Sequence, residues 1–153
     1  MTEKQINVIK RNGRGQEPLN IDKIHDMVEY ACEDIKGVSS SQVEMNSGLQ
    51  FYDNIPTDQI QQILIRSASD LISLEYPNYQ YVASRLLLYS LRKSINGKLW
   101  DHPHLFAHTK KCVKLGVYDE DILVQYDEGD FDRMNTMIDH DRDYNFTYAG
   151  LRQ

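Results

Sequence analysis

The residues with the clearest chemical potential lie near the start of the chain. Residues 8–13 read Val-Ile-Lys-Arg-Asn-Gly, and Asn20 and Lys23 follow where a helix is expected to begin. Lys10 and Arg11 place two cations beside a tight turn, and a helix N-terminus adds unpaired N–H groups and a partial positive charge. This combination predicts a site for a polyphosphate, and hence for a nucleotide. The alternative is that both cations are solvated residues at a strand end.

A second candidate group lies on a later helix. At 100 degrees per residue, Lys93 falls on the same face as Val82, Leu86 and Tyr89, so a cation stands one turn after an aromatic ring. Tyr89 could stack a base or ribose, while Lys93 and the adjacent Arg92 could hold phosphates. The alternative is that Tyr89 belongs to the core and both cations reach water or favour the negative end of the helix dipole.

The histidines and cysteines form no recognised catalytic or metal-binding motif. Cys32 and Cys112 are far apart and sit in no CxxC or Cys/His spacing, so plain thiols are expected. Residues 101–104 (Asp-His-Pro-His) and 139–141 (Asp-His-Asp) could bind a metal, but a solvated loop and a helix cap are the expected roles. An independent hydrolase is not expected, because none of the five histidines is spaced appropriately from a nucleophile: His25, His102, His104, His108 and His140.

The elements that must position these residues follow from periodicity. Residues 5–11 alternate as a strand, residues 12–15 (Asn-Gly-Arg-Gly) signal a turn, and residues 16–19 return as the second strand of a hairpin. Ile24, Val28, Ala31 and Ile35 then form a helical stripe that stops at Gly37. Further helices are predicted from Ser39–Ser41 to about 52, from Thr57 as N-cap to about 72, from Pro77 to Gly97, and at about 104–115, 119–126 and 129–138.

Composition excludes several function classes. The chain has 153 residues, 41% of them apolar, which suffices for one domain or for a small domain and the beginning of another. Residues 1–100 hold 11 Lys and Arg against 12 Asp and Glu, and residues 101–153 hold 6 against 11, so no basic stripe favours duplex nucleic acid. Without an apolar run of about 18 residues or a signal-peptide pattern, we expect no membrane partner and a cytoplasmic location.

The ordered set of motifs resembles one family along the full chain. Val-x-Lys-Arg-x-Gly at 8–13, Asn-x-Asp-Lys-Ile at 20–24, and Pro-x-Tyr-Gln-Tyr-x-Ala-x-Arg-Leu at 77–86 with Leu-Arg-Lys at 91–93 are similar to the ATP-cone of the large subunit of class Ia ribonucleotide reductase. Residues 138–149, with Ile-Asp-His-Asp-Arg-Asp at their start, resemble the beginning of the same subunit's helical region in bacterial and bacteriophage versions.

The resemblance implies an α+β fold, mostly α, in which a small β-hairpin or sheet caps a four-helix bundle. Residues 1–97 would form the ATP-cone, and 98–153 would begin the helical region ahead of the catalytic barrel. ATP at the cone would permit reduction of ribonucleoside diphosphates and dATP would stop it. Because the family's catalytic cysteines lie in the barrel and beyond, the isolated chain is expected not to be catalytic. Its partners would be the remaining large subunit, other large subunits and the radical-generating small subunit.

The resemblance also implies a set of nucleotide contacts, with ATP or dATP, accompanied by Mg²⁺, as effector and no other cofactor. Lys10, Arg11, Arg92 and Lys93 would pair with phosphates, with Lys23 adding to that field, and Glu17 and Asn20 would hydrogen-bond the base or sugar. Asp22 serves equally well as a first-turn helix charge. The remaining positions would contribute through the helix cap, a ring contact, backbone or shape: Thr57, Gln61, Tyr89, Pro18, Leu19 and Ile21.

Two departures from the bacterial pattern stand out. Gln61 replaces a histidine one turn after Thr57, and Tyr89 replaces a common phenylalanine. Gln61 can reach the ligand but cannot carry a charge, which leaves open whether dATP inhibits. Two other interpretations are a vestigial cone that serves only as a docking module, and a cone-containing transcriptional repressor. The repressor would need paired CxxC motifs, which this sequence lacks.

Overall fold

The computed structural model describes residues 6–13, 15–48 and 50–153. Gln5, the first residue of the predicted strand, and Arg14 of the predicted turn lie outside the described residues. The chain divides into two compact units, one formed by the residues up to Leu91 together with Tyr144–Gln153, and the other by Arg92–Asp143. Among the described residues, no helix is both long and apolar enough to cross a membrane.

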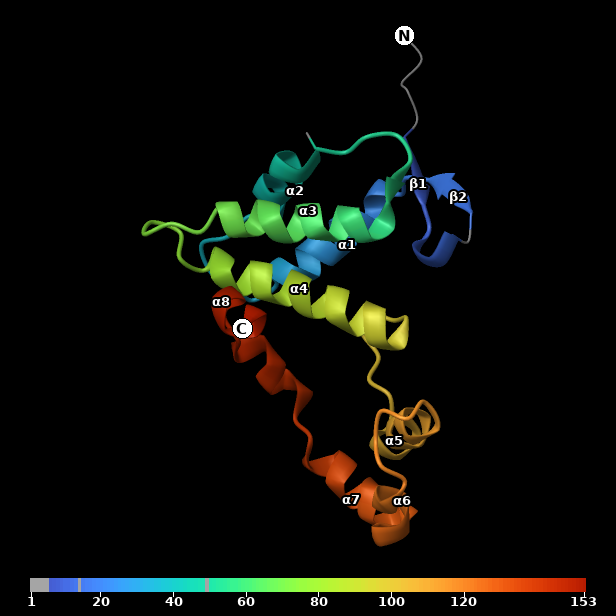
Figure 1. The fold of residues 1–153 in the computed structure, drawn as a ribbon. Coiled ribbons are helices and arrows are strands. Elements are labelled where there is room, and N and C mark those ends of the chain that lie inside the picture. Colours follow the sequence, from blue (N-terminus) through green and yellow to red (C-terminus); the bar gives the residue numbers. More distant parts are fainter. Residues whose placement is uncertain (1–5, 14, 49) are drawn as a thin grey trace. The chain divides into compact units, whose positions relative to one another are not determined.

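A small sheet in the first unit confirms the predicted hairpin and adds a third strand. Strands β1 (Asn7–Ile9) and β2 (Gln16–Pro18) pair antiparallel, and β3 (Ile55–Pro56) pairs parallel to β1, giving the order β2-β1-β3 (Figure 1). The chain turns between β1 and β2 through a 3-10 segment, η1 (Arg11–Gly13). Strand β3 was not predicted, because two residues are too short to show an alternating pattern.

Four helices accompany the sheet, so the mostly α, α+β fold class is confirmed (Figure 1). They are α1 (Ile21–Cys32), α2 (Ser40–Gly48), α3 (Thr57–Asp70) and α4 (Tyr79–Asn96), which extends past Leu91 into the second unit. The apolar side chains predicted to line one face of α1 and one face of α4 are buried within these helices: Ile24, Val28, Ala31, Val82, Leu86 and Tyr89.

Some predicted helix ends are wrong. Helix α1 stops at Cys32, because Asp34 takes a left-handed conformation with φ of 59°; Ile35 therefore lies outside the helix although it is half-buried. Helix α2 ends at Gly48 instead of near residue 52. Thr57 is also not an N-cap. Pro56, the last residue of β3, holds that position with an extended backbone, and its side chain makes no capping hydrogen bond. At the C-terminus of α4, Gly97 closes the helix as predicted, with φ of 74°.

Asn20 is the N-cap residue of α1, a position at which asparagine is common. Its Oδ1 accepts a hydrogen bond of 3.0 Å from the backbone N–H of Lys23. Replacing Asn20 by alanine would leave that N–H without its cap, so we expect the free energy of unfolding to fall by about 1 kcal/mol. Urea denaturation followed by circular dichroism measures the change, and a variant as stable as the parent would contradict this role for Asn20.

His25 links α1 to α2 in a pH-dependent way. Its Nδ1 lies 2.9 Å from Glu44 Oε1, and the hydrogen bond and negative charge of Glu44 raise the pKa of His25 above its ordinary value of 6.5. A raised folded-state pKa means that the stabilisation is full below pH 6.5 and is lost as the pH rises through the folded-state pKa. We expect this fall in stability to be smaller in Glu44→Gln. An NMR titration of the His25 ring checks the pKa itself; a value at or below 6.5 would contradict the prediction.

The second unit is built from short helices around one aromatic core residue. Helices α5 (Leu105–Lys114), α6 (Asp121–Gln125) and α7 (Glu128–Met137) lie within two residues of the predicted ranges, and the 3-10 segment η2 (His140–Asn145) follows. Phe131 of α7 is 2% exposed, with its ring centroid 5.3 Å from that of Phe106 and 6.4 Å from that of Tyr126. Asp127 and Asp130 start α7 with a capping box.

The last residues return to the first unit, which the sequence did not predict. Helix α8 (Tyr148–Arg152) is capped by the Thr147 side chain. On α4, the Arg85 guanidinium lies 5.0 Å from the centre of the Tyr144 ring and donates a 2.6 Å hydrogen bond to the backbone oxygen of Glu33. Arg85 therefore ties the end of α1 and the segment before α8 to α4.

Candidate nucleotide site

Strand register brings the basic turn to the start of a long helix. Because β1 and β3 run parallel with Ile9 opposite Pro56, Lys10 and Arg11 follow β1 at the same edge where Thr57 follows β3. Thr57 begins α3, whose 14 residues give its N-terminus a partial positive charge and free backbone donors. Two cations and a helix N-terminus therefore meet at one edge of the sheet, which is the arrangement that holds phosphate groups.

Gln61 holds Arg11 in place at this corner, where the basic turn meets the N-terminus of α3. It lies one turn after Thr57 on α3, is 5% exposed, and its Oε1 accepts a 2.9 Å hydrogen bond from Nη2 of Arg11. The bond fixes the guanidinium against the first turns of α3. A protonated histidine at this position would instead place a second positive charge beside Arg11, and that repulsion would lower the histidine pKa. The structure thus confirms that positions 57 and 61 share a face and shows Arg11 as the neighbour of Gln61.

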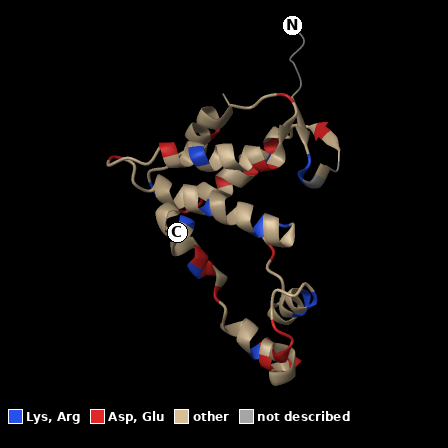
Figure 2. Ribbon diagram, in the orientation of Figure 1, with Lys and Arg blue, Asp and Glu red and all other residues tan. Residues whose placement is uncertain are grey.

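Lys10 is paired within the hairpin. Its Nζ lies 2.7 Å from Oε2 of Glu17, and the two side chains are 46% and 36% exposed. Glu17 is opposite Val8 in the β1–β2 register, and Val8 is 3% exposed, so Lys10 and Glu17 share the face of the hairpin that turns towards the core. An ion pair this exposed contributes only about 0–1 kcal/mol, and a polyphosphate can compete for Lys10 at small cost. Figure 2 shows the basic turn after β1 next to the acidic position on β2.

The start of α1 lies at the other end of the hairpin. Asn7 is opposite Pro18, so Leu19 and the first turn of α1 follow β2 at the edge away from Lys10, separated from it by a three-residue strand of about 10 Å. Lys10 and Arg11 are thus placed for the phosphate end of an elongated ligand. The remaining predicted contacts of this segment lie around the other end: Asn20, Ile21, Asp22 and Lys23.

The three predicted contacts on α4 have different surroundings. Tyr89 is 2% exposed, so its ring fills the core, and stacking on a base would require it to be uncovered. Arg92 is 7% exposed and donates from Nη2 to Oδ2 of Asp143 at 3.0 Å, within the second unit. Lys93 is half-buried in the last turn of α4. Arg92 and Lys93 belong to the second unit and the hairpin to the first, so their convergence on one ligand stays a prediction.

Sequence reasoning missed the residues that hold the hairpin in place. Asp53 Oδ1 accepts a 2.9 Å hydrogen bond from the backbone N–H of Asn7, and Asn54 Oδ1 accepts a 3.0 Å bond from Nε2 of Gln16. Asn54 has a left-handed backbone with φ of 64°. Their sequence signal is an Asp-Asn pair, which is typical of a turn but does not indicate what the turn contacts.

Comparisons with known proteins identify the family of the chain. The family model described as the ATP cone domain matches residues 6–94. The chain is 46% identical over 146 residues to ribonucleoside-diphosphate reductase 1 subunit alpha of Escherichia coli K12, which covers 95% of this chain and 19% of that protein. It is 39% identical over 148 residues to the reductase subunit alpha of Helicobacter pylori 26695, covering 96% and 18% respectively.

A third relative has a similar identity and coverage. The reductase subunit alpha of Buchnera aphidicola from Schizaphis graminum is 45% identical over 95% of this chain and 19% of its own length. The chain therefore spans about a fifth of the length of the curated relatives it matches, and it resembles their N-terminal region. The family model covers more than half of the chain, including the hairpin and every predicted contact residue on helices α1, α3 and α4. The chain belongs to the ATP-cone domain family.

Proposed function

We propose that this chain is the nucleotide-binding regulatory domain of a ribonucleoside-diphosphate reductase large subunit, binding ATP or dATP with Mg²⁺ as allosteric effector. The observation that carries the proposal is the corner at which Arg11, Lys10 and the N-terminus of α3 meet within the region matched by the ATP-cone model. Family membership implies a nucleotide effector, and this corner is the part of the first unit best suited to its phosphates.

In the proposed complex the phosphates replace existing partners of the cations. Lys10 exchanges Glu17 for phosphate, and the Glu17 carboxylate accepts hydrogen bonds from the sugar or base. Asn20 uses Oδ1 as the cap of α1, so its Nδ2 amide group would face the ligand. Arg11 donates to phosphate with the guanidinium nitrogens that Gln61 does not use. Arg92 and Lys93 add to the phosphate contacts from the end of α4.

The whole protein would supply the chemistry that this chain does not carry. We propose that residues 1–97 act as the ATP-cone and residues 98–153 begin the helical region. The rest of the large subunit would then carry the reduction of ribonucleoside diphosphates with a radical-generating small subunit. Regulation requires that ATP and dATP bind differently to two assembly states of these subunits. A cytoplasmic location, expected from the sequence, remains part of this proposal.

Calorimetric titration of the chain with ATP and with dATP tests the proposal. We expect micromolar binding, on the order of −8 kcal/mol, weakened by Lys10→Ala and by Lys93→Ala. Lack of binding by a chain that circular dichroism shows to be folded would favour the second candidate, a docking module with a vestigial pocket. Mutants that bind like the parent would remove these lysines from the site.

Gln61→His tests whether the residue at position 61 discriminates between ATP and dATP. A histidine can donate as well as accept and can become charged, so we expect the ratio of ATP to dATP affinity to move further from one. The change should grow as the pH falls well below about 6.5, because the charge of Arg11 lowers the histidine pKa. Paired titrations of both ligands with parent and variant at two pH values measure the ratio. An unchanged ratio at both pH values would show that residue 61 does not discriminate between the nucleotides.

A further inference from the structure

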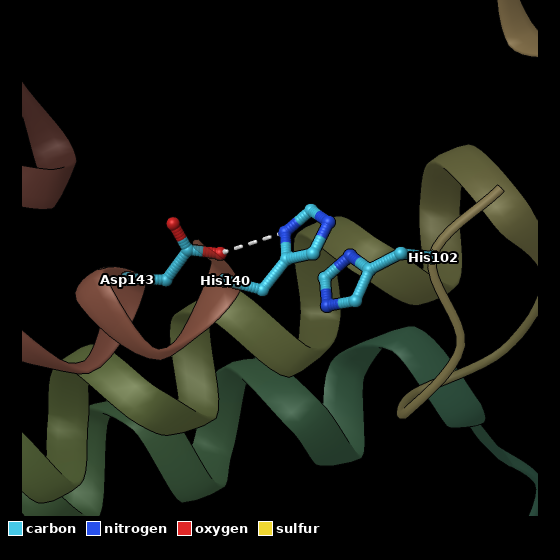
Figure 3. Close-up of side chains that lie close together, drawn as sticks. All are labelled: His102, His140 and Asp143. Carbon is cyan, nitrogen blue, oxygen red and sulfur yellow. Dashed lines mark ion pairs between the residues drawn. The ribbon is translucent and has the colours of Figure 1, made fainter. Parts of the chain in front are cut away.

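Two histidines and a carboxylate meet in the second unit, and the carboxylate, that of Asp143, pairs with Arg92, one of the predicted nucleotide contacts. The rings of His102 and His140 are stacked, with centroids 3.5 Å apart and planes within 5°, and Nδ1 of His140 lies 3.9 Å from Oδ2 of Asp143. One potential ligand atom from each of the three side chains lies within 4.8 Å of the others, and all three side chains are half-buried (Figure 3). We call these three residues the His-His-Asp cluster.

The backbone explains why the cluster forms. His140 and Asp143 are three residues apart in η2, and in a 3-10 helix with three residues per turn such side chains project on the same side. His102 comes from the extended segment between α4 and α5, 38 positions earlier in the sequence. The sequence predicted these two stretches to be a solvated loop and a helix cap; the fold brings one imidazole from each into ring contact.

Carboxylate groups lie beside the imidazoles of the cluster. Asp143 and Asp101 provide negative charge near His102, and the ion pair of 3.0 Å between Arg92 and Asp143 orients the carboxylate as outer groups do in metal sites.

We propose that His102, His140 and Asp143 form a binding site for a divalent transition-metal ion of the zinc type, a site that joins the segment before α5 to η2. Two imidazoles and one carboxylate are a ligand set that zinc accepts, with the fourth position left for water or another ligand. At metal–ligand distances of about 2.0–2.2 Å, the ligand atoms of a tetrahedral site lie about 3.4 Å apart. The cluster reaches this spacing when the two stacked rings turn their edges towards a common point.

The competing pair in the same unit is His108 with Cys112. They are one turn apart on α5, with Sγ 3.4 Å from Nε2 of His108. This pair supplies two ligands from one helix, whereas the cluster supplies three from two segments, and metal affinity rises with the number of ligands held in place. The cluster is therefore the stronger candidate, and the pair provides an internal comparison.

Calorimetric titration of the full 153-residue chain with zinc sulfate tests the proposal. We expect one ion per chain, and His102→Gln and His140→Gln should each lower the affinity about 100-fold. His25→Gln, which removes an imidazole from the first unit, should bind zinc like the parent. Binding that survives both cluster variants, or the absence of any binding, would overturn the proposal.

Two further measurements do not depend on the cluster variants folding. NMR of the parent chain should show the ring signals of His102 and His140 moving together as zinc is added, while those of His25 stay in place. His108→Gln should retain the parent's affinity. Ring signals of His102 and His140 that do not respond, or zinc binding that is lost in His108→Gln, would place the ion elsewhere and refute the site.

Discussion

Arg11→Ala is expected to weaken ATP binding about 10- to 100-fold, the largest loss of affinity expected from a single substitution in the first unit. The guanidinium is held against the start of α3 by Gln61 at 2.9 Å, so it is already oriented when phosphate arrives. Hydrogen bonds between a charged donor and a charged acceptor contribute about 1.5–3 kcal/mol each, and 1.4 kcal/mol corresponds to a factor of about ten in affinity. Calorimetric titration with ATP measures the loss.

Arg66→Ala is the matched control for that substitution. Arg66 lies on α3, the helix that Arg11 contacts, but its side chain is 77% exposed and pairs with Asp70 near the C-terminal end of α3. We expect it to bind ATP like the parent, because it removes the same net charge away from the helix N-terminus. If both variants bound ATP equally weakly, the loss of affinity would be a general effect of net charge. If Arg11→Ala bound ATP like the parent, the guanidinium would be excluded from the site.

Leu64→Ala is expected to lower the free energy of unfolding by about 3 kcal/mol. Leu64 is fully buried in the middle of α3, one turn after Gln61, and truncating a buried leucine removes apolar contacts and leaves a cavity. Since domains of this size are stable by about 5–15 kcal/mol, the loss is a large fraction of the total. Chemical denaturation at neutral pH, followed by circular dichroism, measures the change.

Met45→Ala provides the comparison for Leu64. Met45 lies on α2 and is 73% exposed, so its truncation should change stability by no more than about 0.5 kcal/mol. If both variants, or neither of them, lost about 3 kcal/mol of the free energy of unfolding, the position of α3 in the core would be contradicted. Because α3 also presents Thr57 and Gln61, Leu64→Ala should weaken ATP binding only to the extent that it populates unfolded chains.

The helices were predictable from sequence because each buries a stripe that repeats with the helical period. The ends were less predictable: α1 stops three residues before Ile35 although Ile35 continues the stripe, because Asp34 adopts a left-handed backbone that no periodic pattern reveals. Strand β3 could not be predicted, since its two residues are defined only by pairing with β1. The position of Thr57 within α3 instead of at its cap follows from the same pairing.

The site was predictable as a set of residue types but not as a set of contacts. The basic turn could be recognised locally, but the helix N-terminus beside it is that of α3, whereas the sequence pointed to that of α1. The bond between Arg11 and Gln61 joins residues 50 positions apart and depends on the parallel register of β1 and β3. The same applies to His102 and His140, whose ring contact depends on the packing of the second unit. Spacing along the chain contains no information about such pairs.

A structure of the chain crystallised with ATP tests the central claim most directly, because it locates the phosphates. We predict that they lie against the first turn of α3, within hydrogen-bonding distance of Lys10 and Arg11, with Lys93 brought to the same phosphates and the base towards Glu17 and Asn20. A nucleotide bound with its phosphates away from this corner, or with Lys10 and Lys93 on separate surfaces, would contradict the account.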